Sequence, residues 1–421
     1  MTLSIKVSDL YLIDKEKIAM GLFNIGILIA FLGSLNPWFM WKIGTLYPIP
    51  AAMFIGGSLF VSRSMQKKIF SRNDFLLPLM ALLVFIVYER LSINSNVNGF
   101  IMLIFRAVIF YSLYRISTGY LQQTITFICK VMGALLAVSL AGHILYILGF
   151  PMPGGADVQF DEYYSFTNHY LFLLDDRNLL ILFPRFNSYF LEPSHIGQAC
   201  AFLLFTQRGK WKRWYNIVML ATIFFSFSLA AYVYIITIIF LFLWIERKNF
   251  IGKLLLVVGV IGIVTIFTFT YNDGNNLVHD LILLRLEVED GEMEGDNRVT
   301  NTFEDEYDAY IGTSDIVFGR DLIVTEFGNA GYRVFIYEHG IVGLILIIAV
   351  YVLSMMYSRD TRVILSVMFL SFLFFMVSAF MLWENIYFPL YAAAYLLISK
   401  KRDLESDTLI PPEQPCSAEN S

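Results

Sequence analysis

The sequence has little charge: 15% of its 421 residues are Asp, Glu, Lys or Arg. A soluble domain normally carries about 25%. Hydrophobic residues make up 57% of the chain, so an ordinary soluble globular fold is excluded, and lipid is expected to surround most of the protein. We also find no Gly-rich loop for nucleotide phosphates, and we expect no nucleic-acid partner.

Cysteine is scarce as well. Cys129 and Cys200 fall in apolar runs and Cys416 in the polar tail, so the sequence suggests neither a disulfide nor a cysteine metal site. We expect no metal and no cofactor. A cleavable signal peptide is also absent, because the first apolar run is long and lacks a small-residue cleavage site, which is typical of a first membrane span.

Long apolar runs are abundant. A helix needs about 20 apolar residues to cross the hydrocarbon core, and we expect an all-α polytopic integral membrane protein with about 12 transmembrane helices. The seventh and eighth runs abut at Ser228 and predict a tight hairpin. The twelve runs are 18–34, 46–62, 75–88, 99–116, 124–149, 190–207, 214–228, 229–245, 251–271, 332–357, 363–382 and 385–399.

The distribution of Lys and Arg predicts the orientation. With twelve spans and both termini in the cytoplasm, 21 of the 30 basic residues fall on the cytoplasmic side and 8 on the other. Arg106 alone lies within a span. This asymmetry obeys the positive-inside rule. We therefore expect a multi-pass protein of a bacterial inner (plasma) membrane.

We expect a single transmembrane domain over residues 1–399, followed by a disordered cytoplasmic tail over 400–421. Two extracytoplasmic loops are long, 150–189 and 272–331. The second contains fifteen acidic residues. Its run EVEDGEMEGDN could hold calcium, but it lacks the ordered ligand spacing, and a solvated acidic loop is favoured.

Ionisable residues at membrane depth cluster toward one face. Such residues are costly and usually line a cavity or pair with one another. Together they predict a polar chamber open to the outer face with a hydrophobic floor, although any one of them could simply extend to the interface. They are His143, Glu192, His195, Arg333, Glu338, His339 and Glu384.

The stretch RFNSYFLEPSHIG, residues 185–197, lies at the mouth of this predicted chamber. Pro193 suits the first turn of a helix, and Glu192 and His195 then share one face. A helix N-terminus favours anions, and the fork of Arg185 can bind phosphate in a bidentate manner. These groups predict a site for a phosphorylated lipid. The alternative is a structural ion pair between Arg185 and Glu192.

Two motifs carry a family resemblance. RFNSYFLEPS, residues 185–194, resembles the R-x-x-G-x-F-x-E-P-N pattern of the bacterial O-antigen polymerase and ligase superfamily. NAGYRVFIYEHGIVGLILII, residues 329–348, resembles the stretch of that family in which a span carries E-x-G-[IL]-x-G, here Glu338, Gly340, Ile341 and Gly343. The order of the motifs, the predicted span count and the long loops fit the same family.

Three departures from the family pattern are visible. Ser188 stands where the family usually has glycine, a small-for-small change expected to matter little. After the seventh span the family often has Ser-Arg, whereas this chain reads Ser228-Leu229. The ligase branch places a histidine about eleven residues before the E-x-G glycine, where this chain has Asn329. The resemblance therefore favours a polymerase over a ligase.

The resemblance implies a glycosyltransferase, an O-antigen or surface-polysaccharide polymerase acting in polysaccharide biosynthesis. Such an enzyme transfers a growing glycan from undecaprenyl pyrophosphate to the next lipid-linked repeat unit at the outer face of the membrane. Its donor is a polyprenyl-pyrophosphate-linked oligosaccharide, not a nucleotide sugar. Its partners are that oligosaccharide, membrane lipid and, for chain length, a separate regulator protein.

Catalysis requires cations that stabilise the pyrophosphate and a group that takes the acceptor proton. Arg185 is the first candidate cation, with Glu192 or His195 as the base; Glu192 could instead orient Arg185. The remaining candidates for substrate binding are Arg333, Arg298, Arg320, Arg106, Glu338 and His339.

Three alternatives stay open. An O-antigen ligase is the nearest. A lipid-linked sugar flippase or secondary transporter shares the twelve-span layout, and Arg106 would suit its transport pathway; such proteins usually show repeated halves, and none is evident here. A purely structural role is possible but leaves the charged chamber unexplained.

Overall fold

We analysed a computed structural model, which describes residues 7–63, 76–92, 97–116, 118–160, 165–175, 184–207, 210–246, 250–274, 276, 288–289, 292–293, 301–320, 331–355 and 361–377. The twelfth apolar run, the tail 400–421 and the candidate residues Arg298 and Glu384 lie outside the described residues.

The protein is mostly helical, as expected, and the described helices coincide with the first eleven apolar runs. These helices are α1 (Val7–Leu35), α2 (Pro48–Val61), α4 (Leu76–Ser92), α5 (Val97–Arg115), α6 (Thr118–Ile147), α7 (Pro193–Thr206), α8 (Trp214–Phe225), α9 (Leu229–Glu246), α10 (Phe250–Thr270), α12 (Gly331–Met355) and α13 (Thr361–Val377).

Within the described ranges, four helices are long and apolar enough to cross a membrane: Lys15–Leu35, Gly44–Val61, Gly119–Ile147 and Tyr332–Val350. Shorter apolar helices in the same ranges are Leu79–Tyr88, Trp214–Phe225, Leu229–Ile245 and Thr361–Met376. The protein thus has the helices of an integral membrane protein, and the count of twelve spans stays a prediction.

The first long loop is not wholly irregular, and in this respect the all-α prediction is incomplete. It contains an antiparallel three-stranded sheet, β1 (Ala156–Gln159), β2 (Ser165–Asn168) and β3 (Leu173–Asp175), in the order β1-β2-β3. The strands are three or four residues long, which is why no alternating pattern was visible in the sequence.

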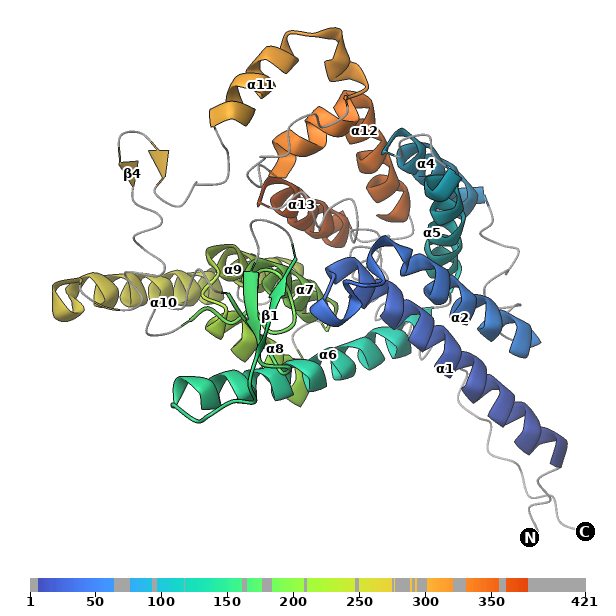
Figure 1. Cartoon of the computed structure of the whole chain (residues 1–421), viewed down its shortest axis with the longest axis horizontal. Helices are drawn as coiled ribbons and strands as arrows, with labels where there is room; N and C mark the ends of the chain where they lie inside the picture. The colour runs from blue at the N-terminus through green and yellow to red at the C-terminus, as the bar shows by residue number, and fades with distance from the viewer. Residues whose placement is uncertain are drawn as a thin grey trace, which may run out of the picture.

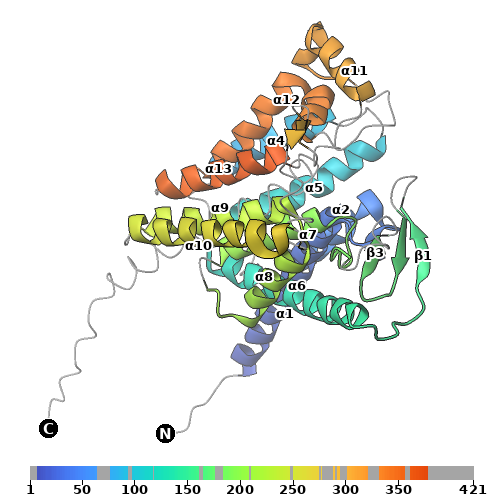
Figure 2. The same cartoon turned by 90° about the vertical axis from the view of Figure 1, so that its left-hand side faces the viewer.

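The second long loop contains short elements as well. They are the hairpin strands β4 (Val288–Glu289) and β5 (Glu292–Met293), the helix α11 (Asn301–Ile311), and the 3-10 turns η5 (Tyr271–Gly274) and η8 (Ser314–Val317). Two further 3-10 turns, η1 (Trp38–Met40) and η2 (Gly44–Leu46), connect α1 to α2. The β1–β3 sheet and α11 both lie toward the right-hand side of Figure 2.

The helices pack into groups that mix distant parts of the chain. α1 packs on α2, α6 on α8 and α7 on α9, whereas α12 packs on α4, more than two hundred residues earlier. Small residues allow close approach between helices: a Cβ added to Gly197 of α7 would lie 2.3 Å from the Cβ of Ala231 in α9. Figure 1 shows α11, α12 and α13 above the group formed by α7, α8 and α9.

Candidate functional site

A break in α12 lies in the E-x-G-I-x-G motif. Gly340 has φ 63° and ψ −172°, so helical geometry is interrupted between Glu338-His339 and Ile341. Positive φ is natural for glycine and strained for residues with a Cβ. The regular helical geometry is therefore disturbed at this kink, and the carbonyls just before it can accept hydrogen bonds from partners outside the helix.

Those partners come from the second long loop. The backbone N–H of Arg320 donates to the carbonyl of Tyr337 (2.9 Å), and the hydroxyl of Tyr310 donates to the carbonyl of Ile336 (2.7 Å). We name α11, η8 and residues 318–320 the α11 cap. The cap therefore supplies hydrogen-bond donors to two carbonyls just before the break in α12.

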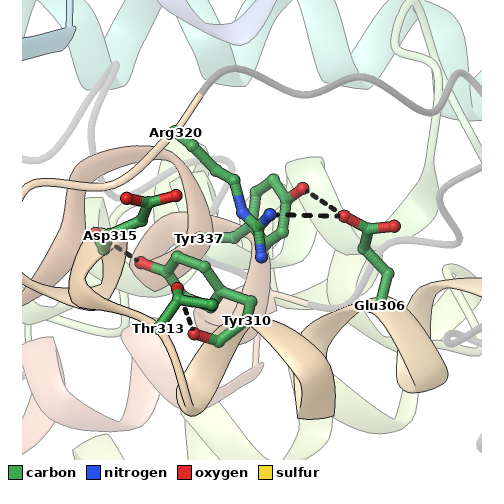
Figure 3. Close-up of polar contacts among 6 residues, drawn as sticks. All are labelled: Glu306, Tyr310, Thr313, Asp315, Arg320 and Tyr337. Atoms are coloured by element: carbon green, nitrogen blue, oxygen red, sulfur yellow. Dashed lines mark hydrogen bonds and ion pairs between the residues drawn. The ribbon is translucent and has the colours of Figure 1, made fainter.

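Arg320 is held between two aromatic rings (Figure 3). Its Cζ lies 4.8 Å from the ring centroid of Tyr310 and 4.9 Å from that of Tyr337. Its Nη1 lies 3.8 Å from Oε1 of Glu306, an oxygen that also accepts a hydrogen bond from the Tyr337 hydroxyl at 2.9 Å. The guanidinium is thus oriented by two rings and one carboxylate.

Arg333, near the start of α12, pairs with a second carboxylate of α11. Its Nη1 donates to Oε1 of Glu304 at 3.1 Å, and its Cζ lies 5.7 Å from the ring centroid of Tyr307. Both predicted cations of this region are therefore held by glutamates from the same short helix.

The aromatic contacts that attach α11 are buried. Phe303, Tyr307, Tyr310 and Tyr337 form a cluster of their own, separate from the main core. Burial raises the pKa of Tyr310 to about 12 and raises the pKa of Tyr307 as well. Both phenols therefore stay neutral at physiological pH and can act as hydrogen-bond donors.

Arg185 lies in a different group of helices. It is close enough to Tyr232 of α9 for the two side chains to interact electrostatically. The next residue fixes the backbone, because the Phe186 N–H donates to the carbonyl of Phe225 at the end of α8 (3.2 Å). The residue before it is also held, by His143 of α6, whose Nε2 lies 3.1 Å from the Pro184 carbonyl oxygen.

Ser188 adopts φ 50°, in the left-handed region that favours glycine. A glycine at this position would adopt the same backbone conformation without the strain that a Cβ brings. The Ser188 carbonyl accepts the Leu173 N–H from β3 at 2.7 Å, and the next carbonyl, of Tyr189, accepts the N–H of Trp38 at 2.8 Å. β3, together with η1 between α1 and α2, thus fixes the segment that joins Arg185 to α7.

α7 begins as expected. Glu192 is the N-cap, with φ −134° and ψ 148°, and Pro193 is the first helical residue. The Ser194 hydroxyl donates to Oε2 of Glu192 at 2.7 Å, and the N–H of His195 donates to the Glu192 carbonyl at 3.2 Å. His195 is buried, whereas Glu192 is half-buried, so of the two it is Glu192 whose side chain is partly accessible.

The predicted site residues fall into two main clusters. Arg185, Glu192 and His195 lie on α7 and the segment before it, whereas Arg320, Arg333, Glu338 and His339 lie on the α11 cap and α12. The His339 ring stacks on Phe335 at 4.7 Å, and its Nδ1 lies 3.9 Å from Oε2 of Glu338. Arg106 is half-buried in the middle of α5, which packs on α2 and α4.

Sequence reasoning missed the residues that position the cations. Glu304, Glu306 and Tyr310 lie in the second long loop, where no helix was expected, although Phe303, Tyr307 and Tyr310 at spacings of four and three indicate one apolar helix face. His143 was noted only as one of several ionisable groups. Trp38, whose backbone contacts the Arg185 segment, carried no sequence signal.

Among the described residues, no group of three or more His, Cys, Asp or Glu side chains is arranged to hold a metal ion. Most of the acidic run EVEDGEMEGDN lies outside the described ranges. No family model, curated protein or solved structure matches this chain.

Proposed function

We propose that this protein is a membrane glycosyltransferase that polymerises lipid-linked repeat units, moving a growing glycan from a polyprenyl diphosphate to the next unit at the outer face of the membrane. One observation carries the proposal. Within the described residues, the two motif stretches lie at a helix start and at a helix break: α7 begins at Pro193, and α12 is interrupted at Gly340. Each point lies near an arginine that other elements hold in place, Arg185 and Arg320.

Strained or interrupted backbone at membrane depth persists only where it serves a purpose or lines a polar space. Such points expose backbone dipoles and can recognise charge. A lipid diphosphate is the fitting ligand, because its charged group sits at the membrane surface while its chain lies between helices. The predicted clustering of ionisable residues toward the outer face of the membrane supports a reaction at that face.

The length of α7 supports a recessed site. Its 14 residues rise about 21 Å, less than the hydrocarbon core of about 30 Å. In the proposed arrangement, α7 and the turn-containing segment 184–192 before it share one crossing, and the mouth lies below the membrane surface. A site at this depth brings the diphosphate to Arg185 while the polyprenyl chain stays in lipid.

The residues take distinct roles in the proposed reaction. Arg185 stabilises negative charge that builds on the departing diphosphate, the type of electrostatic assistance that is often the largest catalytic contribution. Glu192 accepts the proton of the acceptor hydroxyl or orients the groups around it; its contact with Ser194 shows that it can hold a hydroxyl donor. His195 is too buried to meet a sugar without movement of the mouth and supports Glu192 instead.

A flippase or transporter is the second candidate, and the break at Gly340 is the observation that favours it, since interrupted helices are common in transporters. Surface and lipid-linked glycans from a strain with the gene deleted and then restored separate the candidates on a gel. Lipid acceptors with a single repeat that become a ladder on restoration support a polymerase. Long polymer left on its carrier indicates a ligase, and repeat units trapped inside the cell indicate a flippase.

A further inference from the structure

Arg320 of the α11 cap and Arg333 of α12 each form an ion pair with a carboxylate of the protein itself. Glu306 faces Arg320 and Glu304 faces Arg333, and both glutamates belong to α11. An arginine intended only to fasten a helix is commonly buried with its carboxylate in a bidentate pair. Neither pair has that character, as the geometry of each shows.

Both ion pairs are partly exposed to solvent, and neither is bidentate. The Arg320 and Glu306 side chains are 26% and 32% exposed, and their nearest N–O distance is 3.8 Å, longer than a hydrogen bond. Arg333 and Glu304 are 29% and 51% exposed and share one contact of 3.1 Å. Ion pairs with this exposure contribute little to stability, so an anion with more charge and more oxygens can replace the carboxylate.

Arg320 does not depend on Glu306 for its position. Its backbone N–H is bonded to the Tyr337 carbonyl, and its guanidinium lies against the rings of Tyr310 and Tyr337. When Glu306 leaves, the guanidinium and the Tyr337 hydroxyl stay in place, and both are donors. The site that remains is one arginine and one phenol beside the break in α12, suited to phosphate oxygens.

We propose that Glu304 and Glu306 hold the positions of phosphate oxygens on Arg333 and Arg320, and that diphosphate displaces each carboxylate when it binds to that arginine. This inference rests on the proposed function for the choice of ligand. It gives the α11 cap a purpose beyond structure: its carboxylates keep the cations paired and the site closed to weak anions until a diphosphate arrives.

The direction of a change in affinity tests the proposal. If the carboxylates compete with the ligand, Glu304→Gln and Glu306→Gln each tighten diphosphate binding, by about two- to fivefold, the equivalent of one exposed ion pair. If the carboxylates only position the arginines, the same variants weaken binding. Asp305→Asn is the matched control, because it removes one charge from the same helix at an exposed position and leaves the affinity nearly unchanged.

The full chain in lipid nanodiscs is titrated with inorganic diphosphate and, separately, with undecaprenyl diphosphate. Tighter binding of either probe by both glutamine variants, but not by Asp305→Asn, supports the proposal, and the probe that binds identifies a free anion or a lipid headgroup as the source. Unchanged or weaker binding, an equal gain in the control, or no binding of either probe overturns it. If Glu306→Gln fails to fold, Glu304→Gln, whose side chain is the more exposed of the two, decides alone.

Failure of this inference is distinct from failure of the proposed function. If the strain makes a glycan ladder but the glutamine variants bind diphosphate no more tightly, the polymerase function is supported and the displacement of Glu304 and Glu306 is contradicted. If the strain makes no ladder but the purified glutamine variants bind diphosphate more tightly, the diphosphate site is supported and the polymerase function is contradicted.

Discussion

The backbone of Gly319 in the α11 cap lies directly against the backbone of Gly340 at the break in α12. A Cβ added to Gly340 would lie 2.5 Å from the Gly319 nitrogen, and one added to Gly319 would lie 2.6 Å from the His339 nitrogen. Both glycines also have positive φ, 81° and 63°. The cap and the interrupted helix therefore meet through two residues at which no side chain fits, and this contact joins the second long loop to the predicted membrane-spanning part.

Gly340→Ala is expected to destabilise the protein by about 1–3 kcal/mol, because alanine is strained at this φ and its Cβ meets backbone atoms that cannot move independently. The midpoint of thermal unfolding in detergent should fall, and proteolysis within residues 301–320 should become faster. Gly259→Ala in α10 is the control, since a Cβ there meets nothing within 4 Å. Equal stability of the two variants would show that the Gly319–Gly340 contact is not tight.

The Tyr310 phenol is expected to set an upper pH limit on docking of the cap. Its pKa in the folded protein is about 12 because of burial, whereas an unfolded tyrosine has a pKa of about 10. Neutral Tyr310 therefore favours the docked cap fully below pH of about 10, and this contribution is lost as pH rises toward 12. The difference in phenolate absorbance between wild type and Tyr310→Phe should titrate near 12; a midpoint near 10 would contradict the buried, hydrogen-bonded position.

Ser188→Gly is expected to stabilise the protein by about 0.5–1 kcal/mol. The left-handed conformation costs a residue with a Cβ about 1–2 kcal/mol, which exceeds the entropic cost of glycine, about 0.5–1 kcal/mol. Ser188→Ala is the matched control, because it also removes the buried hydroxyl but keeps the strain. The midpoint of thermal unfolding should rise more for the glycine variant than for the alanine variant; the reverse order would mean that the backbone at residue 188 is not strained.

Much of the framework could be predicted from sequence. Apolar runs located the described helices because lipid demands uniform hydrophobicity, and Pro193 located the start of α7 because proline lacks the N–H that a first turn leaves unused. The boundary between α8 and α9 followed from the two adjoining runs at Ser228. Each of these features depends on local chemistry, which the sequence shows directly.

The contacts between distant segments could not be predicted in the same way. The hydrogen bond from Arg320 to Tyr337 and the packing of α12 on α4 depend on which helices meet. The residue pattern of a single sequence does not show which helices pack together. The sequence also suggested one polar chamber, whereas the described contacts hold Arg185 with α8 and α9 and hold Arg320 and Arg333 with α11. That both groups bind the same substrate remains a prediction.

The role of Arg185 is the central claim, and two substitutions distinguish charge from geometry. Arg185→Ala should abolish polymer formation while the protein still inserts in the membrane, because the backbone bonds of Phe186 and Pro184 do not involve the guanidinium. Arg185→Lys should recover little activity, since a lysine cannot form a bidentate contact with phosphate oxygens.

The most direct measurement uses purified protein in proteoliposomes supplied with undecaprenyl-diphosphate-linked repeat units, with the products separated on a gel. The account predicts a ladder of lengthening glycans from the wild-type protein, only the single-repeat substrate from Arg185→Ala, and traces of short products from Arg185→Lys. A ladder of normal length from Arg185→Ala, or no ladder from a folded wild-type protein, would contradict it.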